Sequence, residues 1–119
     1  MQNSPKDLRK KILGRQGELL AVHYLKKHGY KIVMQNYKTP FGEADIVAEK
    51  DGVTSFVEVK TRSSDKFGRA AEAITPDKQR RYRQIAAYYC ATLHTEVAVR
   101  FDVASIDDGR LEYFENAFR

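Results

Sequence analysis

The chain has 119 residues, of which 42% are hydrophobic and 31% charged, so it suffices for one globular domain with a buried core and is not expected to be disordered. Its single cysteine excludes a framework of disulfides within the chain, and the sequence has no apolar run long enough for a signal peptide or a membrane span. These features predict a soluble cytoplasmic protein with no membrane partner.

The net charge of +5 is unevenly distributed along the chain. Residues 1–30 carry seven lysines and arginines against two acids, residues 60–83 carry eight against three, and residues 31–59 have a net charge of −2. Two basic segments therefore flank an acidic one. Such clustering is typical of a protein that binds a polyanion such as nucleic acid, while a solvated basic surface is the alternative.

A helix is predicted from Asp7 to His28, with Gly29 in the position that ends it. Glu18 lies on one helical stripe with small and apolar residues, and an acid is costly to bury there unless it is paired or bound to a metal. The other members of this stripe are Ala21, Val22 and Leu25. An ion pair with Arg15, one turn earlier, is the alternative role for Glu18.

A first strand is predicted at Tyr30–Tyr37, which is rich in β-branched and aromatic residues. The turn residues at 39–42 then lead into a hairpin that extends to residue 62. Its two strands meet at Asp51-Gly52, because an Asp-Gly pair supplies the two positive-φ positions of a type I′ turn.

Counting away from this turn in an undisturbed antiparallel register, Asp45 faces Glu58, and Glu43 faces Lys60. Opposed residues project to the same face with Cβ atoms about 4.5–5.5 Å apart. Two adjacent carboxylates repel one another unless a cation lies between them, and Mg²⁺ is typically held by one or two carboxylates with water and substrate phosphates. The hairpin therefore predicts a divalent-cation site for Mg²⁺, with Mn²⁺ as the alternative ion.

Simpler interpretations of the hairpin stay open. The valines of its second strand form the predicted core face, so Glu58 on the opposite face would ordinarily be solvated. Glu43 could pair with Lys60, which would compete with a catalytic role for that lysine. A β-bulge near Asp45 would turn its carboxylate to the other face of the sheet.

Residues 62–75 are predicted to form a loop, followed by a helix from Pro76 to His94 with Thr75 as its N-cap. The buried face of this helix is predicted to comprise Tyr82, Ile85, Ala86, Tyr89 and Leu93. Four basic residues crowd its first two turns, where the helix dipole disfavours cations, which indicates a bound anion, a nearby acidic site or a merely solvated basic face. These residues are Lys78, Arg80, Arg81 and Arg83.

The remaining segments predict a strand at Glu96–Ile106, a turn at 107–109 and an edge strand at Leu111–Phe114. The element order αβββαββ indicates an α/β fold with a mixed sheet covered by helices. Residues 1–6 have no periodicity and are expected to form a flexible N-terminus, so the single domain is predicted to span residues 7–119.

The motif Glu58-Val59-Lys60 gains meaning from an acid thirteen residues earlier on the paired strand, Asp45, and from Glu18 on the preceding helix. In this arrangement the chain resembles the PD-(D/E)xK nuclease superfamily. More narrowly, five segments covering nearly all of the chain from residue 14 onward are similar to the YraN-like family of small bacterial proteins. They read GRQGELLAVHYLKKHGY, GEADIV, FVEVKTR, FGRAAEAIT and PDKQRRYRQIAAYY.

The sequence departs from the superfamily pattern at Ala44, which stands where the motif name has proline. The metal-binding acid next to it is retained, so only the local bend of the strand is expected to be made differently. Among the other polar residues, the three histidines have no metal-ligand spacing, and Cys90 has no nearby histidine that would make it a nucleophile.

The resemblance implies a restriction endonuclease-like three-layer fold with an αβββαβ core, and a metal-dependent nuclease that hydrolyses phosphodiester bonds in DNA. The implied catalytic residues are Glu18, Asp45, Glu58 and Lys60. The implied metal ligands are Asp45, Glu58 and the Val59 carbonyl, with Glu18 bound directly or through water. The residues expected to contact nucleic acid, from the basic segments and the resemblance together, are Arg15, Arg62, Arg69, Lys78, Gln79 and Arg81.

Similarity to Holliday junction resolvases suggests branched or flapped DNA as the substrate, and a homodimer in which two copies cut both strands is compatible with the sequence. The main alternative is a non-catalytic nucleic-acid-binding module that keeps the nuclease fold. A third candidate, a protein-interaction domain, would require the acidic residues of the hairpin to be opposed by accident.

Overall fold

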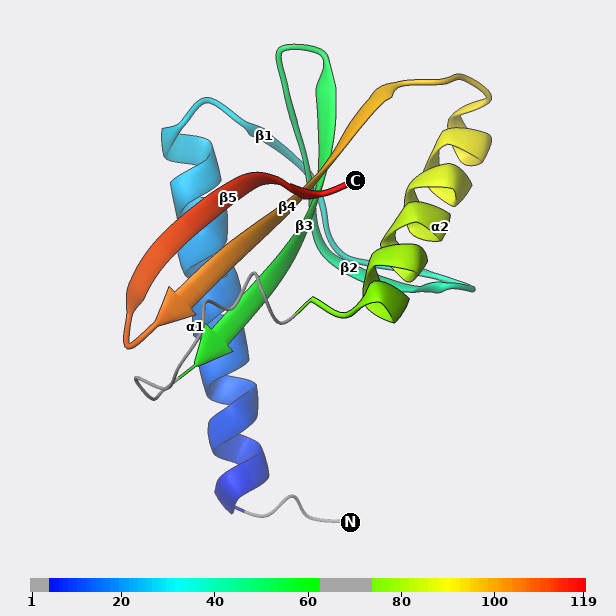
Figure 1. The fold of residues 1–119 in the computed structure, drawn as a ribbon. Coiled ribbons are helices and arrows are strands. Elements are labelled where there is room, and N and C mark those ends of the chain that lie inside the picture. Colours follow the sequence, from blue (N-terminus) through cyan, green and yellow to red (C-terminus); the bar gives the residue numbers. More distant parts are fainter. Residues whose placement is uncertain (1–4, 63–73) are drawn as a thin grey trace.

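The computed structural model of the protein describes residues 5–62 and 74–119. Its elements, in chain order, are α1 (Pro5–Lys27), β1 (Lys31–Thr39), β2 (Gly42–Lys50), β3 (Val53–Arg62), α2 (Pro76–Leu93), β4 (Ala98–Asp107) and β5 (Arg110–Phe118) (Figure 1). The predicted order αβββαββ is confirmed. Helix α1 begins two residues before the predicted start, and β5 runs four residues beyond the predicted edge strand. Most of the predicted loop, residues 63–73, lies outside the described residues.

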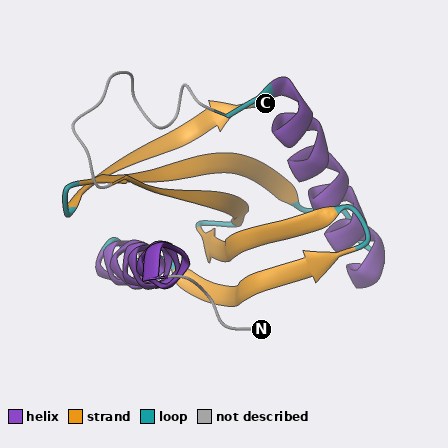
Figure 2. Cartoon of the chain, turned by 90° about the horizontal axis from the view of Figure 1, so that it is seen from below, coloured by secondary structure: helices purple, strands orange, loops and turns teal. Residues whose placement is uncertain are grey.

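The five strands form one mixed sheet in the order β1-β2-β3-β4-β5. Neighbouring strands are antiparallel except β3 and β4, which are parallel and are joined through α2. Helices α1 and α2 lie against different parts of the sheet (Figure 2). This arrangement is compatible with the predicted three-layer, restriction endonuclease-like fold. Neither helix combines the length and apolar character needed to cross a membrane, within the part of the chain that the structure describes.

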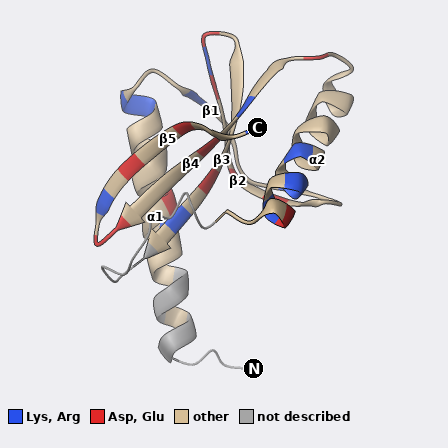
Figure 3. Ribbon diagram, viewed as in Figure 1, with Lys and Arg blue, Asp and Glu red and all other residues tan. Residues whose placement is uncertain are grey.

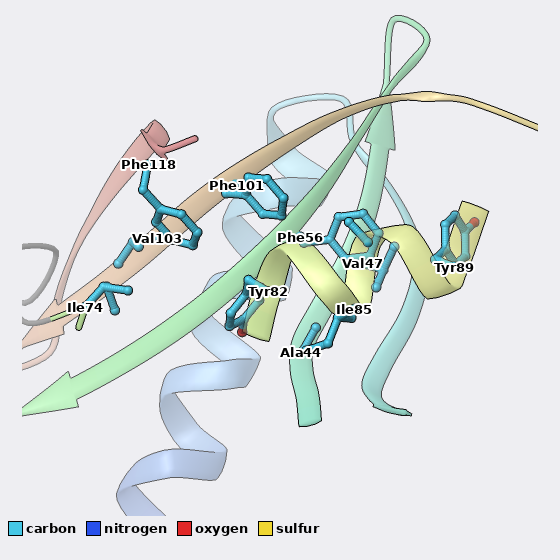
Figure 4. Packing of buried hydrophobic residues seen from close by; sticks show 11 residues of the cluster. Ala44, Val47, Phe56, Ile74, Tyr82, Ile85, Tyr89, Phe101, Val103 and Phe118 are labelled. Atoms are coloured by element: carbon cyan, nitrogen blue, oxygen red, sulfur yellow. The ribbon is translucent and has the colours of Figure 1, made fainter. Parts of the chain in front are cut away.

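Two hydrophobic clusters cover the two faces of the central strands. On the α2 side, Phe56 packs against Tyr82 and Tyr89, as Figure 4 shows. On the α1 side, Val57 packs with residues of α1 such as Leu25. The predicted core face of the valines is confirmed, but the expectation of a solvated opposite face is wrong, because α2 covers it. Strand β3 is therefore buried on both faces.

Two tight turns follow the predicted chemistry. Asp51 and Gly52 have φ angles of 52° and 80°, as a type I′ hairpin requires. The turn between β4 and β5 repeats the pattern at Asp108 and Gly109, with φ angles of 51° and 79°. The first turn sets the register of β2 against β3, and this register positions the acidic residues of the hairpin.

Helix α2 starts as predicted, since the Thr75 side chain accepts a hydrogen bond of 3.1 Å from the Lys78 backbone amide. The predicted buried face is confirmed for its first four members. The assignment of Leu93 to that face is wrong, because its side chain is 44% exposed. Leu93 is the last residue of the helix, just before the chain reverses at His94 in a left-handed conformation.

A second buried acid, Asp102 on β4, has a purely structural environment. Its carboxylate receives hydrogen bonds from the Arg100 guanidinium at 2.9 and 3.0 Å, from the Tyr113 hydroxyl at 2.6 Å and from the Asn116 backbone amide at 2.9 Å. These fixed partners satisfy both oxygens at the point where the pairing of β4 and β5 shifts register. Asp102 therefore stabilises the sheet edge and leaves no oxygen open to a ligand.

Helix α1 approaches β3 most closely at Gly17. A Cβ atom placed on Gly17 would lie 2.0 Å from the Oγ1 atom of Thr61 and 3.3 Å from its Cβ. The absence of a side chain therefore allows the helix backbone to lie directly on the strand. Because Glu18 is the next residue along the helix, this contact also determines how close Glu18 comes to the hairpin acids.

We predict that Gly17→Ala lowers the free energy of unfolding by about 1–3 kcal/mol through overpacking, partly offset by a gain in helix propensity of about 1 kcal/mol. The matched control is Gly14→Ala in the same helix, where an added Cβ meets nothing within 4 Å and only the stabilising effect is expected. Urea denaturation measures both. The destabilisation should disappear in a Thr61→Ala background, and an equal loss in both backgrounds would contradict the contact.

Candidate active site

The hydrogen-bonded ladder between β2 and β3 stops next to Asp45. It follows the predicted register from the hairpin turn to the pair Ile46–Val57, which is the last pair of this ladder in the described chain. Beyond this pair, the Val59 backbone amide donates a hydrogen bond of 2.7 Å to the Oδ2 atom of Asp45. A side-chain carboxylate thus takes the place of a backbone carbonyl, and the predicted register does not extend to Asp45 itself.

The backbone of β2 is irregular at the same point. Ala44 packs in the cluster on the α2 side, and Ile46 packs in the cluster on the α1 side, although residues two apart in a regular strand share a face. On the neighbouring strand β1, Asn36 has a φ angle of 53°. The strand therefore changes face at Asp45 without a proline, which is the bend that the Ala44 position left to be explained.

Glu58 is buried on the α2 side of β3, with only 4% of its surface exposed. The Tyr82 hydroxyl donates a hydrogen bond of 2.6 Å to its Oε1 atom, and the Lys78 ammonium lies 2.6 Å from its Oε2 atom. The alternative of a solvated Glu58 is therefore wrong. Both partners come from α2, where their spacing of four residues places them on one face of the helix.

The carboxyl groups of Asp45 and Glu58 act directly on one another. Burial raises the pKa of Asp45 to about 7, helped by the negative charge of Glu58 and opposed by the hydrogen bond from the Val59 amide. Burial and the two carboxylates also raise the pKa of Tyr82, so its hydroxyl keeps its proton and donates it to Glu58. Near neutral pH, Asp45 therefore binds a proton that a nearby cation would displace.

Glu18 lies half-buried on α1 at the edge of this site. Burial raises its pKa, and the charge of Glu43 adds to the effect. A hydrogen bond with the Asn36 side chain and the charge of Arg15 act in the opposite direction, and Arg15 has the smallest of the four effects. An ion pair with Arg15 is therefore not the main interaction of Glu18.

The four predicted catalytic side chains line one pocket of about 430 Å³. Its lining residues are Leu13, Gly14, Glu18, Asp45, Glu58, Val59, Lys60 and Thr61. A wider groove of about 890 Å³ adjoins it and shares Glu18, with Glu43 and Arg15 also on its wall. Within residues 5–62 and 74–119, Lys60 has no ion-pair partner, so the alternative pairing with Glu43 is not formed there.

The donor set fits a hard divalent cation. No group of three or more His, Cys, Asp or Glu side chains is close enough to hold a metal ion by itself, among the residues that the structure describes. Mg²⁺ does not need such a cage, because it is usually bound by one or two carboxylates and completes its shell with water and substrate phosphates. The adjoining carboxyls of Asp45 and Glu58 meet this requirement, and Glu18 lies on the wall of the same pocket.

The structure assigns local partners to the predicted nucleic-acid residues of α2. Lys78 binds the buried carboxylate described above. Gln79 donates a hydrogen bond of 3.0 Å from its side chain to the Ile74 carbonyl, and Arg81 pairs with Asp77 at 2.8 Å. Figure 3 shows the basic positions gathered at the start of this helix. The nearby acidic group that the crowded charges indicated is thus present for Lys78.

The other predicted nucleic-acid residues are spread along the chain. Arg15 is exposed on α1 beside the wider groove, and Arg62 is the last residue of β3. Arg69 lies outside the described residues. Sequence reasoning missed Tyr82 as a member of the site, since its place on the apolar stripe of α2 indicated only a core residue. The spacing of four residues from Lys78 was the available signal.

Comparisons with known proteins agree with this architecture. The uncharacterised protein family UPF0102 matches residues 17–106 of the chain. A UPF0102 protein of Thermodesulfovibrio yellowstonii is 46% identical over 106 residues, which cover 89% of this chain and 95% of the relative. UPF0102 proteins of Desulfosudis oleivorans and Alkaliphilus metalliredigens are 44% and 41% identical, over 88% and 91% of this chain and 88% and 98% of their own lengths.

The raised pKa of Asp45 predicts a pH-dependent loss of stability in the metal-free protein. Between its ordinary value of 3.8 and about 7, the folded state holds a proton on Asp45 that the unfolded state has released. The free energy of unfolding therefore falls as the pH rises through this window, by about 1.4 kcal/mol for each unit of pKa shift. Asp45→Asn, which is neutral at every pH, should melt at a higher temperature than wild type at pH 8, with a smaller difference at pH 4.

The control for this measurement is Asp51→Asn in the exposed hairpin turn, whose φ angle of 52° asparagine also adopts. Thermal melts in EDTA across the pH range compare the three proteins. An Asp45→Asn difference that stays the same from pH 4 to pH 8 would contradict the proposed protonation of Asp45.

Proposed function

Because this chain belongs to the UPF0102 family, the YraN-like group of the restriction endonuclease-like superfamily, we propose that it is a metal-dependent nuclease that hydrolyses phosphodiester bonds in DNA. The observation that carries the proposal is the buried contact of Asp45 with Glu58 in a pocket that Lys60 also lines. Two carboxylates in contact are unfavourable in a protein interior unless a cation or a proton serves both.

In this proposal Asp45 and Glu58 hold Mg²⁺ or Mn²⁺, with the Val59 carbonyl and Glu18 as further ligands. When bound, the ion supplies charge stabilisation at a phosphoryl oxygen and lowers the pKa of a coordinated water so that hydroxide is accessible near neutral pH. The chain fixes both carboxylates in place, Asp45 through the Val59 amide and Glu58 through the Tyr82 hydroxyl. Such fixed donors reduce the reorganisation that the reaction requires.

Lys60 is the proposed catalytic cation. It follows Glu58 by two residues on β3 and lines the same pocket. Its ammonium has no ion pair in the described part of the chain, so it is available to orient the attacking water or to stabilise charge on the phosphate in the transition state. A lysine already neutralised by Glu43 would serve neither purpose.

The substrate side of the proposal rests on charge and on family resemblance. The basic segments on either side of the acidic hairpin support DNA as the polyanion, and the similarity to Holliday junction resolvases supports branched or flapped structures. A non-catalytic nucleic-acid-binding module is the second candidate. The ion pair of Lys78 with Glu58 favours it, because it neutralises one of the two acids without a metal.

Cleavage assays on labelled linear, single-stranded, flapped and four-way DNA, with Mg²⁺, Mn²⁺ or EDTA, test the proposal. Lys60→Ala should leave folding and metal binding intact and lower cleavage by about 10²-fold or more. Asp45→Asn should abolish cleavage and weaken Mg²⁺ binding while DNA binding persists. Lys31→Ala, an exposed lysine of β1 outside the pocket, is the matched control and should cleave like wild type.

Equal trace activity in wild type, Lys60→Ala and Asp45→Asn would identify that activity as a contaminant. The nuclease proposal would then be wrong, and the binding-module candidate would replace it.

DNA binding is predicted to depend steeply on salt. Each neutralised phosphate of duplex DNA contributes about −0.9 to the slope of log K against log salt concentration. Replacing Arg15 or Arg62 by alanine should make the slope shallower by about this amount for each phosphate that the variant leaves without its arginine. Fluorescence anisotropy in EDTA between 50 and 200 mM salt, as an approximate range for this comparison, measures the slope. Affinity that does not change with salt would refute a phosphate-driven interface.

A further inference from the structure

Lys78 occupies the carboxylate that the proposed metal needs. Its ammonium lies 2.6 Å from the Oε2 atom of Glu58, and the Tyr82 hydroxyl takes the Oε1 atom at the same distance. We propose that Lys78 is an exchangeable counter-ion, which neutralises Glu58 in the metal-free protein, leaves it when a divalent cation binds, and then contacts a phosphate of the substrate. This inference rests on the proposed function and adds a coupling between metal and DNA binding.

Electrostatics make the two cations competitors. A divalent cation on Glu58 and an ammonium in contact with the same carboxylate would lie within a few ångströms of one another, in a site where burial weakens solvent screening. Repulsion between them is therefore strong. The Tyr82 hydroxyl carries no charge and can remain bound to Glu58 in both states.

The mobility of the partners indicates which one gives way. The Glu58 side chain is 5% exposed and Tyr82 is 1% exposed, so both are fixed by packing. The Lys78 side chain is 36% exposed and ends a flexible four-carbon stem on the first turn of α2. Lys78 can therefore leave Glu58 by rotating toward solvent, without unpacking the core.

A released Lys78 remains beside the site, in surroundings that suit a phosphate. It lies at the N-terminal end of an 18-residue helix, where the helix dipole disfavours a cation and favours an anion. Arg81, one turn further on, lines a small pocket together with Lys78 and Tyr82. Loss of the Glu58 partner would thus leave the ammonium with an unfavourable dipole that a bound phosphate relieves.

The predicted consequence is positive coupling, in which a divalent cation strengthens DNA binding and DNA strengthens cation binding by the same factor. Typical couplings of this kind amount to about 5–150-fold. Lys78→Met removes the competing charge and keeps the length of the side chain. It should bind the cation about tenfold or more tightly than wild type and should lose most of the cation-dependent gain in DNA affinity.

Titration calorimetry with Mg²⁺ and with Ca²⁺, and anisotropy of a labelled DNA hairpin with and without Ca²⁺, measure these effects, with the DNA checked for intactness on a gel. The matched control is Arg80→Met on the same turn, which removes the same charge from an exposed residue whose partner is Asp77. Lys78→Gln is the second variant, since its amide still hydrogen-bonds to Glu58 if Lys78→Met does not fold.

Tighter cation binding in the Lys78 variants than in Arg80→Met supports the exchange. Equal cation affinity in wild type, the Lys78 variants and Arg80→Met overturns it and leaves the proposed nuclease intact. If none of these proteins binds a divalent cation, both the exchange and the metal-dependent function are overturned.

Discussion

The site depends on one interruption of the sheet. Where β2 and β3 stop pairing, the Val59 amide still requires an acceptor, because an unpaired buried backbone donor is costly. The Asp45 carboxylate supplies it at 2.7 Å. This hydrogen bond fixes the acid on the strand, places it against Glu58 and leaves space between the strands for a pocket. Without the interruption, a regular ladder would fill this space with backbone hydrogen bonds.

Both helices are committed to the same place. Helix α1 lies directly on β3 at Gly17 and presents Glu18 to the pocket, whereas α2 covers the other face and supplies Tyr82 and Lys78 to Glu58. A buried carboxylate without such partners would be strongly unfavourable. The layers of the fold therefore stabilise the sheet and also satisfy the charges that it encloses.

Local rules predicted most of the architecture. The Asp51-Gly52 turn determined the hairpin register, and helical spacing identified the buried stripes of α1 and α2 except at Leu93. Three features escaped these rules because they arise from tertiary packing. They are the burial of Glu58 under α2, the change of face at Asp45 and the role of Tyr82. Strand alternation alone does not reveal that a second layer covers a face carrying charged residues.

The hydrogen bond from Val59 to Asp45 also makes the backbone a spectroscopic probe of the site. The resonance of an amide proton bonded to a carboxylate responds to the charge of that carboxylate, whereas an amide within the regular ladder has only a neutral carbonyl as its partner. The ¹⁵N–¹H signal of Val59 will therefore change as Asp45 gains or loses its proton or a cation, while the amide of Val57, two residues away in the paired ladder, serves as an internal reference.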